Sequence, residues 1–179
     1  LEIAVLAATF RSTAKASRLI ELIHRAIPYP VVLVASQEPT LFLSLAHKRW
    51  SQGETGKVVV EGAAETTTLG SKDTIEVDFL KALSLANQPR QNLYGLYQGW
   101  IDCVTALSAG RLSGVFVLDD TPESAANRRT MLNRHALYRR EIAMLRQQVA
   151  KERQLSRRVE LNLKIQFLEA ELLKTGDAL

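Results

Sequence analysis

The chain has 179 residues, of which 46% are hydrophobic and 23% charged, and its formal net charge is +4. This length and composition suit a soluble protein with one full core, or one core and an appendage. The single cysteine, Cys103, excludes an internal disulfide framework and indicates a reducing compartment. No apolar run is long enough to span a bilayer, so we expect a cytoplasmic protein without a membrane segment.

The first segments predict a buried strand followed by an amphipathic helix. Residues 1–10 are apolar nearly throughout, as in a strand covered on both faces. Residues 16–27 place apolar side chains at helical spacing. We expect Ser12 or Thr13 to cap this helix, and Pro28 to end it.

Further strands follow. Residues 31–35 are rich in β-branched side chains and predict a second strand. Residues 41–47 alternate with period two after a short turn, which predicts a third strand antiparallel to the second. We expect a fourth strand at 58–61, and a loop or ragged edge strand over 62–72.

From residue 74 onward the apolar period becomes helical. Asp73 or Thr74 is the expected cap of a first helix, whose apolar stripe contains Val77, Leu80 and Leu83. A second helix is expected over residues 93–109, with Gly110 ending it. Cys103 lies among apolar residues of this helix, so we expect a buried structural thiol.

The last third of the chain predicts a basic helical arm. Residues 121–179, here called the arm, contain twelve Lys/Arg and seven Asp/Glu, a net charge of +5. Residues 1–120 contain eleven basic and twelve acidic residues, a net charge of −1. This asymmetry indicates a polyanion or an acidic partner, or a solvated arginine-rich helix.

Two apolar series with steps of three, four and seven residues run along the arm, and the register breaks between Glu152 and Arg158. Helix formation is expected to begin near Thr121 or Ser124, and Ser156 is the expected cap of a second helix. The pattern favours an antiparallel hairpin of two helices. One long helix with a stutter, dimerising as a coiled coil, is the alternative.

These elements predict an α+β fold. A small mixed or antiparallel sheet of about four strands with packed helices occupies residues 1–120, and the helical hairpin occupies residues 121–179. The chain begins directly in a strand without an initiator Met, so we expect part of the first domain to be missing.

No catalytic constellation is evident. The segment 53–57 lacks the glycine spacing and hydroxyl of a phosphate-binding loop and is interpreted as a polar turn. His24, His47 and His135 fall on three different elements, without metal-ligand spacing, and we interpret His24 and His47 as surface residues. We expect no cofactor, no metal and no catalytic residue, and the sequence leans against an enzyme.

Two basic groups are candidate binding sites. Lys48, Arg49 and Trp50, beside His47, join cations to an aromatic ring at a strand end, which suits a phosphate and a stacked base. Alternatively, this is a solvated strand end with the Trp tucked against the sheet. In the arm, the arginines are concentrated in two pairs, Arg139–Arg140 and Arg157–Arg158, among basic residues that begin with Arg128.

Three segments resemble the prokaryotic domain of unknown function 4391 family. They are His24–Pro30 followed by the VVLVA strand, Ala46-His47-Lys48, and the most specific one, KERQLSRRVELNLKI at residues 151–165. His47 replaces an aromatic residue of the family at that position. The polar Asn162 within this helix is interpreted as a register or partner-recognition residue.

The resemblance implies a small protein encoded beside helicase and methyltransferase genes of restriction-like phage-defence clusters. Our leading hypothesis is therefore a non-enzymatic interaction subunit of a DNA-targeting assembly, which docks a helicase or methyltransferase through the arm. Direct nucleic-acid binding through the basic arm and Lys48–Trp50 is the alternative. An enzyme whose site lies in the missing N-terminal portion is the second alternative, and homo-oligomerisation through the arm is also open.

Overall fold

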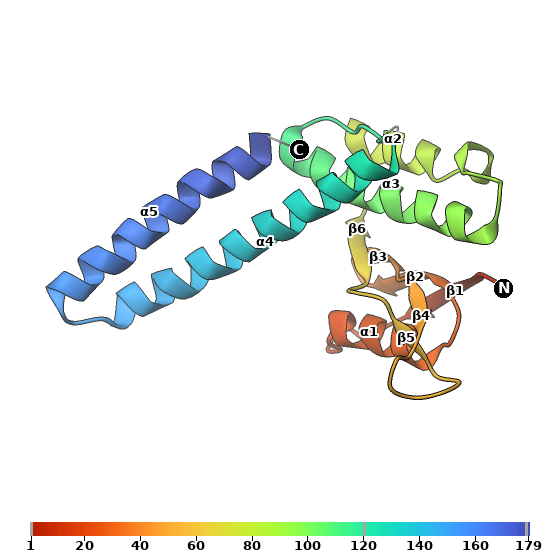
Figure 1. Ribbon diagram of the computed structural model, residues 1–179, viewed down its shortest axis with the longest axis horizontal. Helices are drawn as coiled ribbons and strands as arrows, with labels where there is room; N and C mark the ends of the chain where they lie inside the picture. The colour runs from red at the N-terminus through yellow and green to blue at the C-terminus, as the bar shows by residue number, and fades with distance from the viewer. Residues whose placement is uncertain (1, 120, 178) are drawn as a thin grey trace. The chain divides into compact units, whose positions relative to one another are not determined.

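The computed structural model describes residues 2–119, 121–177 and 179 (Figure 1). The chain forms two compact units, one up to Leu107 and one from Ser108 onward. The first contains two sheets with helices around them, and the second contains a pair of long helices.

The main sheet of the first unit has four strands in the order β1-β2-β3-β6. β1 (Ala4–Thr9) and β2 (Val31–Gln37) are parallel, with Ala4 opposite Val31. β3 (Thr40–Leu45) is antiparallel to β2, and β6 (Glu65–Leu69) is antiparallel to β3. The expected mixed sheet of four strands is therefore confirmed, including the β2–β3 pairing.

α1 (Ala16–Ala26) connects the parallel strands and packs on one face of the sheet. Its Ile20 belongs to a buried cluster with the side chains of β2 that point to that face: Val31, Leu33 and Ala35. The expected cap at Ser12 or Thr13 is wrong, because Lys15 precedes the first helical residue and makes no side-chain capping bond. The turn at residues 12–14 is instead held by Gln37, whose side-chain amide donates to the carbonyls of Arg11 and Ala14.

A second, two-stranded sheet was not expected. β4 (Lys48–Trp50) pairs antiparallel with β5 (Val58–Val60), outside the main sheet. The strand expected at residues 58–61 therefore exists, but the fourth strand of the main sheet is β6, from the segment interpreted as a loop or edge strand. Strand formation there agrees with its Thr-rich sequence, since β-branched residues favour a pleated surface.

α2 (Thr74–Ala82) begins with the expected cap, because the Asp73 carboxylate accepts the Glu76 amide at 2.7 Å. The expected buried stripe is wrong: Val77 and Leu80 are 42% and 50% exposed. The helix buries Phe79 and Ala82 instead, together with the Glu76 side chain, which accepts hydrogen bonds from the backbone of Gly70 and Ser71. This polar clamp orients α2 by a contact that apolar periodicity does not reveal. A short 3-10 helix, η1 (Leu85–Asn87), follows.

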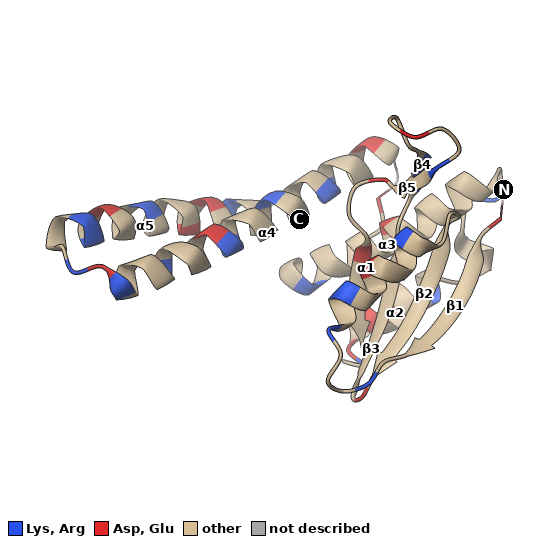
Figure 2. Cartoon of the chain, turned by 90° about the horizontal axis from the view of Figure 1, so that it is seen from below, with Lys and Arg blue, Asp and Glu red and all other residues tan. Residues whose placement is uncertain are grey.

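α3 (Leu93–Ser113) and α2 lie on the side of the main sheet away from α1 (Figures 1 and 2). The buried Tyr97 hydroxyl accepts the Ala46 amide and donates to the Val31 carbonyl, both at 2.8 Å, so it connects α3 to β2 and to the end of β3. Cys103 is buried, as expected. The expected helix end at Gly110 is wrong, because α3 continues to Ser113 and Gly114 follows with φ of 88°.

The arm forms two helices, α4 (Pro122–Lys151) and α5 (Leu155–Asp177), which pack against each other. α4 begins where it was expected, and Thr121 caps it by accepting the Ser124 amide. The two apolar series expected in the arm meet in the seam between these two helices, except for Met131 at the start of the first series, which is not part of the cluster. Ile142, Leu145, Ile165 and Leu168 lie at the centre of the seam, with Tyr138, Val149, Leu161 and Leu172 beside them. The α+β fold with a C-terminal helical pair is confirmed.

Ser156 does not cap the second helix, because α5 begins one residue before it. The link is organised by Glu152 instead. Its carboxylate accepts the amides of Gln154 and Arg153 at 2.9 and 2.8 Å, and these bonds lower the pKa of that carboxyl group.

Candidate functional site

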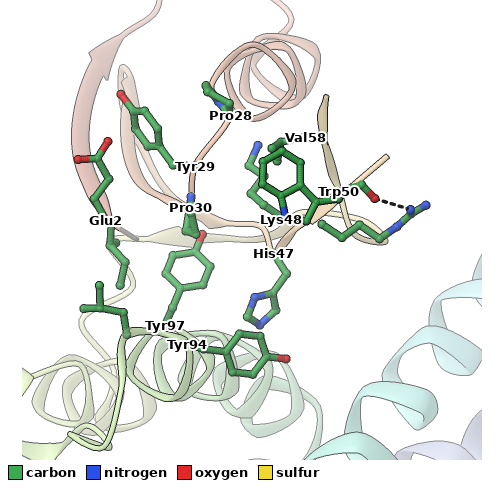
Figure 3. A pocket seen from close by; sticks show the side chains of 13 residues that line it. Glu2, Pro28, Tyr29, Pro30, His47, Lys48, Trp50, Val58, Tyr94 and Tyr97 are labelled. Atoms are coloured by element: carbon green, nitrogen blue, oxygen red, sulfur yellow. Dashed lines mark hydrogen bonds between the residues drawn. The ribbon is translucent and has the colours of Figure 1, made fainter. Parts of the chain in front are cut away.

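A cavity of about 390 Å³ lies at one end of the strands of the main sheet in the first unit. At this end β1 and β2 begin and β3 stops, because β1 is parallel to β2 and β3 is antiparallel to it. Side chains from β4, β5 and the start of α3 complete the lining (Figure 3). We call this cavity the Trp50 pocket; its lining includes Glu2, Tyr29, His47, Lys48, Arg49, Trp50, Tyr94 and Tyr97.

The predicted residues Lys48, Arg49 and Trp50 all line this pocket. Trp50 is 70% exposed, so the interpretation in which it is tucked against the sheet is wrong. Its strand belongs to the two-stranded β4–β5 sheet, which offers no broad apolar face for the indole to cover. Sequence reasoning found these residues from the cations beside an aromatic ring, but it missed the opposite walls, which come from residues far away in the chain.

His47 is fixed between two aromatic rings. It stacks on Tyr94, with ring centroids 4.9 Å apart and an interplanar angle of 21°, and meets Tyr97 edge-on at 5.4 Å. We expected His47 at the surface, but it is half-buried, because Tyr94 and Tyr97 of α3 pack around it.

A chain of hydrogen bonds determines which nitrogen of His47 carries the proton. The Gln98 side-chain amide donates to Asp102 Oδ1 at 2.8 Å, so its carbonyl Oε1 faces His47 Nε2 at 2.7 Å. Because that oxygen only accepts, Nε2 is the donor. In neutral His47 the lone pair is therefore on Nδ1, and this nitrogen can accept a hydrogen bond.

Lys48 connects the pocket to α1. Its ammonium donates to the carbonyl of His24, one of the carbonyls left open at the C-terminal end of α1. Burial lowers the pKa of Lys48. An ammonium has three N–H donors, and this contact occupies one of them.

His24 is 1% exposed, so its expected surface position is wrong. Its Nε2 lies 2.9 Å from the Ser44 hydroxyl, and its Nδ1 has no hydrogen-bond partner among the described residues. Burial, with a smaller contribution from the Lys48 charge, lowers the pKa of His24 to about 4. The side chain is therefore a neutral core residue at neutral pH.

The arginines of the arm do not gather at one place. Arg139, Arg140, Arg157, Arg158 and the predicted Asn162 are all exposed. The first pair lies about 20 Å along α4 from the link, at 1.5 Å per residue, whereas Arg157 and Arg158 lie in the first turn of α5. Basic residues occur along both helices, among acidic ones (Figure 2).

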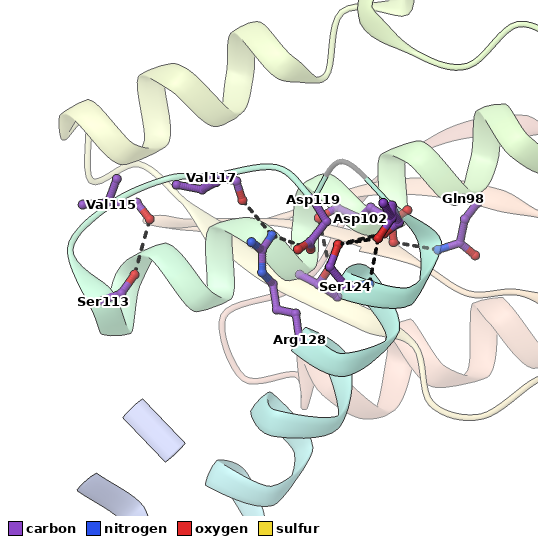
Figure 4. Close-up of polar contacts among 10 residues, drawn as sticks. Gln98, Asp102, Ser113, Val115, Val117, Asp119, Ser124 and Arg128 are labelled. Atoms are coloured by element: carbon purple, nitrogen blue, oxygen red, sulfur yellow. Dashed lines mark hydrogen bonds and ion pairs between the residues drawn. The ribbon is translucent and has the colours of Figure 1, made fainter. Parts of the chain in front are cut away.

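Several arm cations are already paired. Arg146 contacts Glu169 at 2.6 Å and Lys164 contacts Glu141 at 2.7 Å, both across the seam. Arg128, the first of the basic residues of the arm, is 11% exposed and already bound (Figure 4). It pairs with Asp119 at 2.8 Å and donates to the Val117 carbonyl at 2.6 Å, so it holds the segment before α4.

α5 also has an apolar row that sequence reasoning missed. Leu155, Val159, Leu163 and Phe167 are between 50% and 73% exposed. At about 100° per residue, this row lies almost opposite the row that packs on α4. We call these four residues the outer row. Their constant spacing of four was visible in the sequence, but the stronger heptad pattern of the seam masked it.

Among the described residues, no three His, Cys, Asp or Glu side chains gather as metal ligands. In the same part of the chain, no helix is both long and apolar enough to cross a bilayer.

No curated protein and no solved structure matches the chain. A family profile, described as a domain of unknown function (DUF4391), matches residues 1–172 of the 179. This match includes the pocket, the seam and the outer row, and it confirms the resemblance of the three sequence segments. The chain therefore belongs to the DUF4391 family.

Proposed function

We propose that this protein is an interaction subunit that docks a protein partner through the outer row of α5. The observation that carries the proposal is that α5 is apolar on two opposite sides, of which only one is covered by α4. A surface helix normally needs one apolar face. A second row of four exposed, large apolar side chains is typical of a surface that is covered in an assembly.

The seam already provides the hydrophobic contacts that a hairpin needs. Ile165 and Leu168 are 8% and 5% exposed, whereas Leu163 and Phe167 are 60% and 64% exposed. Exposed apolar residues at i and i+4 form one ridge, which is the pattern by which a helix docks on a partner helix. The outer row therefore contributes to the arm's surface without contributing to its seam.

The charges of the arm favour an acidic partner. Among the described residues, no ion pair neutralises the exposed arginines Arg134, Arg139, Arg140, Arg153 and Arg158. Arg158 is next to Val159 of the outer row. An amphipathic helix with an apolar face and acidic flanks has the complementary pattern, and its charges would steer association.

For the partner, the proposal follows the setting that the family resemblance implies: the helicase or methyltransferase of a DNA-targeting phage-defence system. The protein would then be an accessory subunit of that assembly. Direct nucleic-acid binding by the arm would use the arginines and would not need the outer row, so mutation separates the two hypotheses.

The test is co-expression of the chain with the neighbouring helicase and, separately, with the methyltransferase. The double variant Leu163→Glu/Phe167→Glu introduces two acids into the outer row. Ala136→Glu/Ala143→Glu introduces the same charge at exposed positions of α4 and serves as the matched control. Circular dichroism of each variant checks that the helices are retained.

The proposal expects a stable complex for the unsubstituted chain and the control, and its loss in the outer-row variant. Equal retention in both variants would contradict docking through the outer row. Equal loss in both would indicate that charge alone drives association, as for a polyanion. A homodimer abolished by the outer-row variant would identify a second copy as the occupant and also contradict the proposal.

A further inference from the structure

We infer that the Trp50 pocket of the first unit binds a nucleotide, with the base stacked on the aromatic wall and the phosphate held by Lys48 and Arg49. This site is separate from the outer row of α5, and the inference does not depend on the docking proposal. It names a ligand for a cavity whose lining residues all belong to the first unit.

The wall of the pocket is unusually aromatic for this chain. The sequence contains two Trp and four Tyr, and four of these six line the pocket: Tyr29, Trp50, Tyr94 and Tyr97. Three of them keep large exposed areas: 37% for Tyr29, 70% for Trp50 and 64% for Tyr94. Exposed rings at one cavity present π-faces on which a base can stack.

The polar groups of the pocket differ between its sides. Lys48 and Arg49 belong to β4 beside Trp50, and Glu2 lies on the opposite wall (Figure 3). Lys48 has two N–H donors beyond the one that holds the His24 carbonyl. Arg49 uses Nη1 for the Trp50 carbonyl at 3.2 Å, and its guanidinium has further donors. These cations suit a phosphate next to the stacked ring.

His47 provides an acceptor of fixed orientation. Gln98 and Asp102 hold the proton on Nε2 and Tyr94 holds the ring plane, so this lining residue keeps its lone pair on Nδ1, the nitrogen that can accept a hydrogen bond from a ligand. A base carries N–H donors at its edge, such as those of an exocyclic amine, and one of these can donate to His47 Nδ1. A cavity of about 390 Å³ is at the small end of ligand sites, which suits a single nucleotide rather than a longer stretch of strand.

A free nucleotide and the terminal nucleotide of a strand share this chemistry. Isothermal titration of the full chain with AMP, adenosine and ribose 5-phosphate measures the contributions of base and phosphate. Titration with a single-stranded DNA octamer, with and without a 5′-phosphate, distinguishes the source. Tighter binding of the phosphorylated octamer than of AMP identifies a strand end, and tighter binding of AMP identifies a free nucleotide.

The variants use exposed side chains, so that folding is preserved. Trp50→Ala is expected to weaken AMP binding by about 5- to 150-fold, because base stacking contributes ~1–3 kcal/mol. Arg49→Gln is expected to weaken AMP binding severalfold and to leave the affinity for adenosine unchanged, because adenosine has no phosphate. Leu22→Ala, at an exposed position of α1 that does not line the pocket, is the control and is expected to bind as the unsubstituted chain does.

Three results would overturn the inference. These are the absence of binding by both AMP and the phosphorylated octamer at millimolar concentration, equal affinity for AMP and adenosine, and unchanged AMP affinity in Trp50→Ala. Because none of these variants alters the arm, failure here leaves the docking proposal standing, and failure of docking leaves the pocket standing.

Discussion

His47 Nε2 lies 2.7 Å from Oε1 of Gln98, and Gln98 Nε2 donates to Asp102 at 2.8 Å, so the two bonds together fix the orientation of the amide and the tautomer of the ring. We predict that neutral His47 is protonated on Nε2, and that Gln98→Leu yields a mixture of tautomers. Long-range ¹H–¹⁵N correlation spectra at basic pH measure both. An Nδ1-protonated ring in the unsubstituted chain would contradict the hydrogen-bond direction assigned to Gln98.

Tyr97→Phe removes the hydroxyl that pairs the Ala46 amide with the Val31 carbonyl. Both groups are left unpaired in the core, so the free energy of unfolding is expected to fall by about 1–3 kcal/mol. Urea denaturation measures the change. Tyr94→Phe removes an exposed hydroxyl instead and is the matched control, with an expected change below about 0.5 kcal/mol. Equal effects of the two substitutions would refute the role given to Tyr97.

His24 makes stability depend on pH. Because its pKa is about 4 in the folded chain, against 6.5 for an unperturbed histidine, the unfolded chain takes up the proton first as the pH falls. The stabilisation is complete above pH 6.5 and is lost toward pH 4, with an upper size of about 3 kcal/mol.

The measurement is the urea midpoint of the unsubstituted chain and of His24→Gln from pH 7.5 to 4. Other carboxyl groups titrate near the lower limit in both proteins, so the difference between the two is the informative quantity. We expect that difference to shrink as the pH falls. A difference independent of pH would show that folding does not lower the pKa of His24.

The Cys103 thiol is expected to be unreactive in the folded chain. Burial raises its pKa to about 11, and the thiolate is the reactive form. At pH 8, modification by dithionitrobenzoate should be slow without denaturant and rapid in urea. Rapid modification without denaturant would indicate that α3 opens at this position.

The sequence was sufficient to predict those helices and strands whose apolar periodicity is visible within one short segment. Alternation at residues 41–47 predicted the strand antiparallel to β2, and the two apolar series of the arm predicted the seam around Leu145 and Ile165. Local capping was partly predictable, since Asp73 caps α2 as expected, and α4 begins after Thr121, where its start was expected.

The features that were missed depend on contacts between distant residues. His24 is buried because Ser44 and Lys48 meet it from β3 and β4, and α2 turns its Phe79 side inward with Glu76 held by the preceding loop. The pocket likewise requires Glu2, Tyr29 and Tyr94 to meet β4. Periodicity shows that a helix has an apolar face, but the tertiary fold decides which face is covered.

The four arm arginines are expected to raise the affinity of the partner complex without being essential for its formation. Replacing Arg139, Arg140, Arg157 and Arg158 by Gln should weaken the partner complex severalfold at low salt, with little effect at high salt, because exposed charges act mainly through screened steering. Affinity measurements at two salt concentrations test this. Loss of the complex at both concentrations would contradict the secondary role of charge.

The most direct test of the docking proposal is to measure site-specific photo-crosslinks from the arm to the partner in the assembled complex. Benzoylphenylalanine is placed at Phe167 in the outer row and, for comparison, at the exposed Gln148 of α4. Docking through the outer row predicts a crosslink to the helicase or methyltransferase from position 167 and none from position 148. A complex that forms but crosslinks only from position 148, or from neither position, would contradict it.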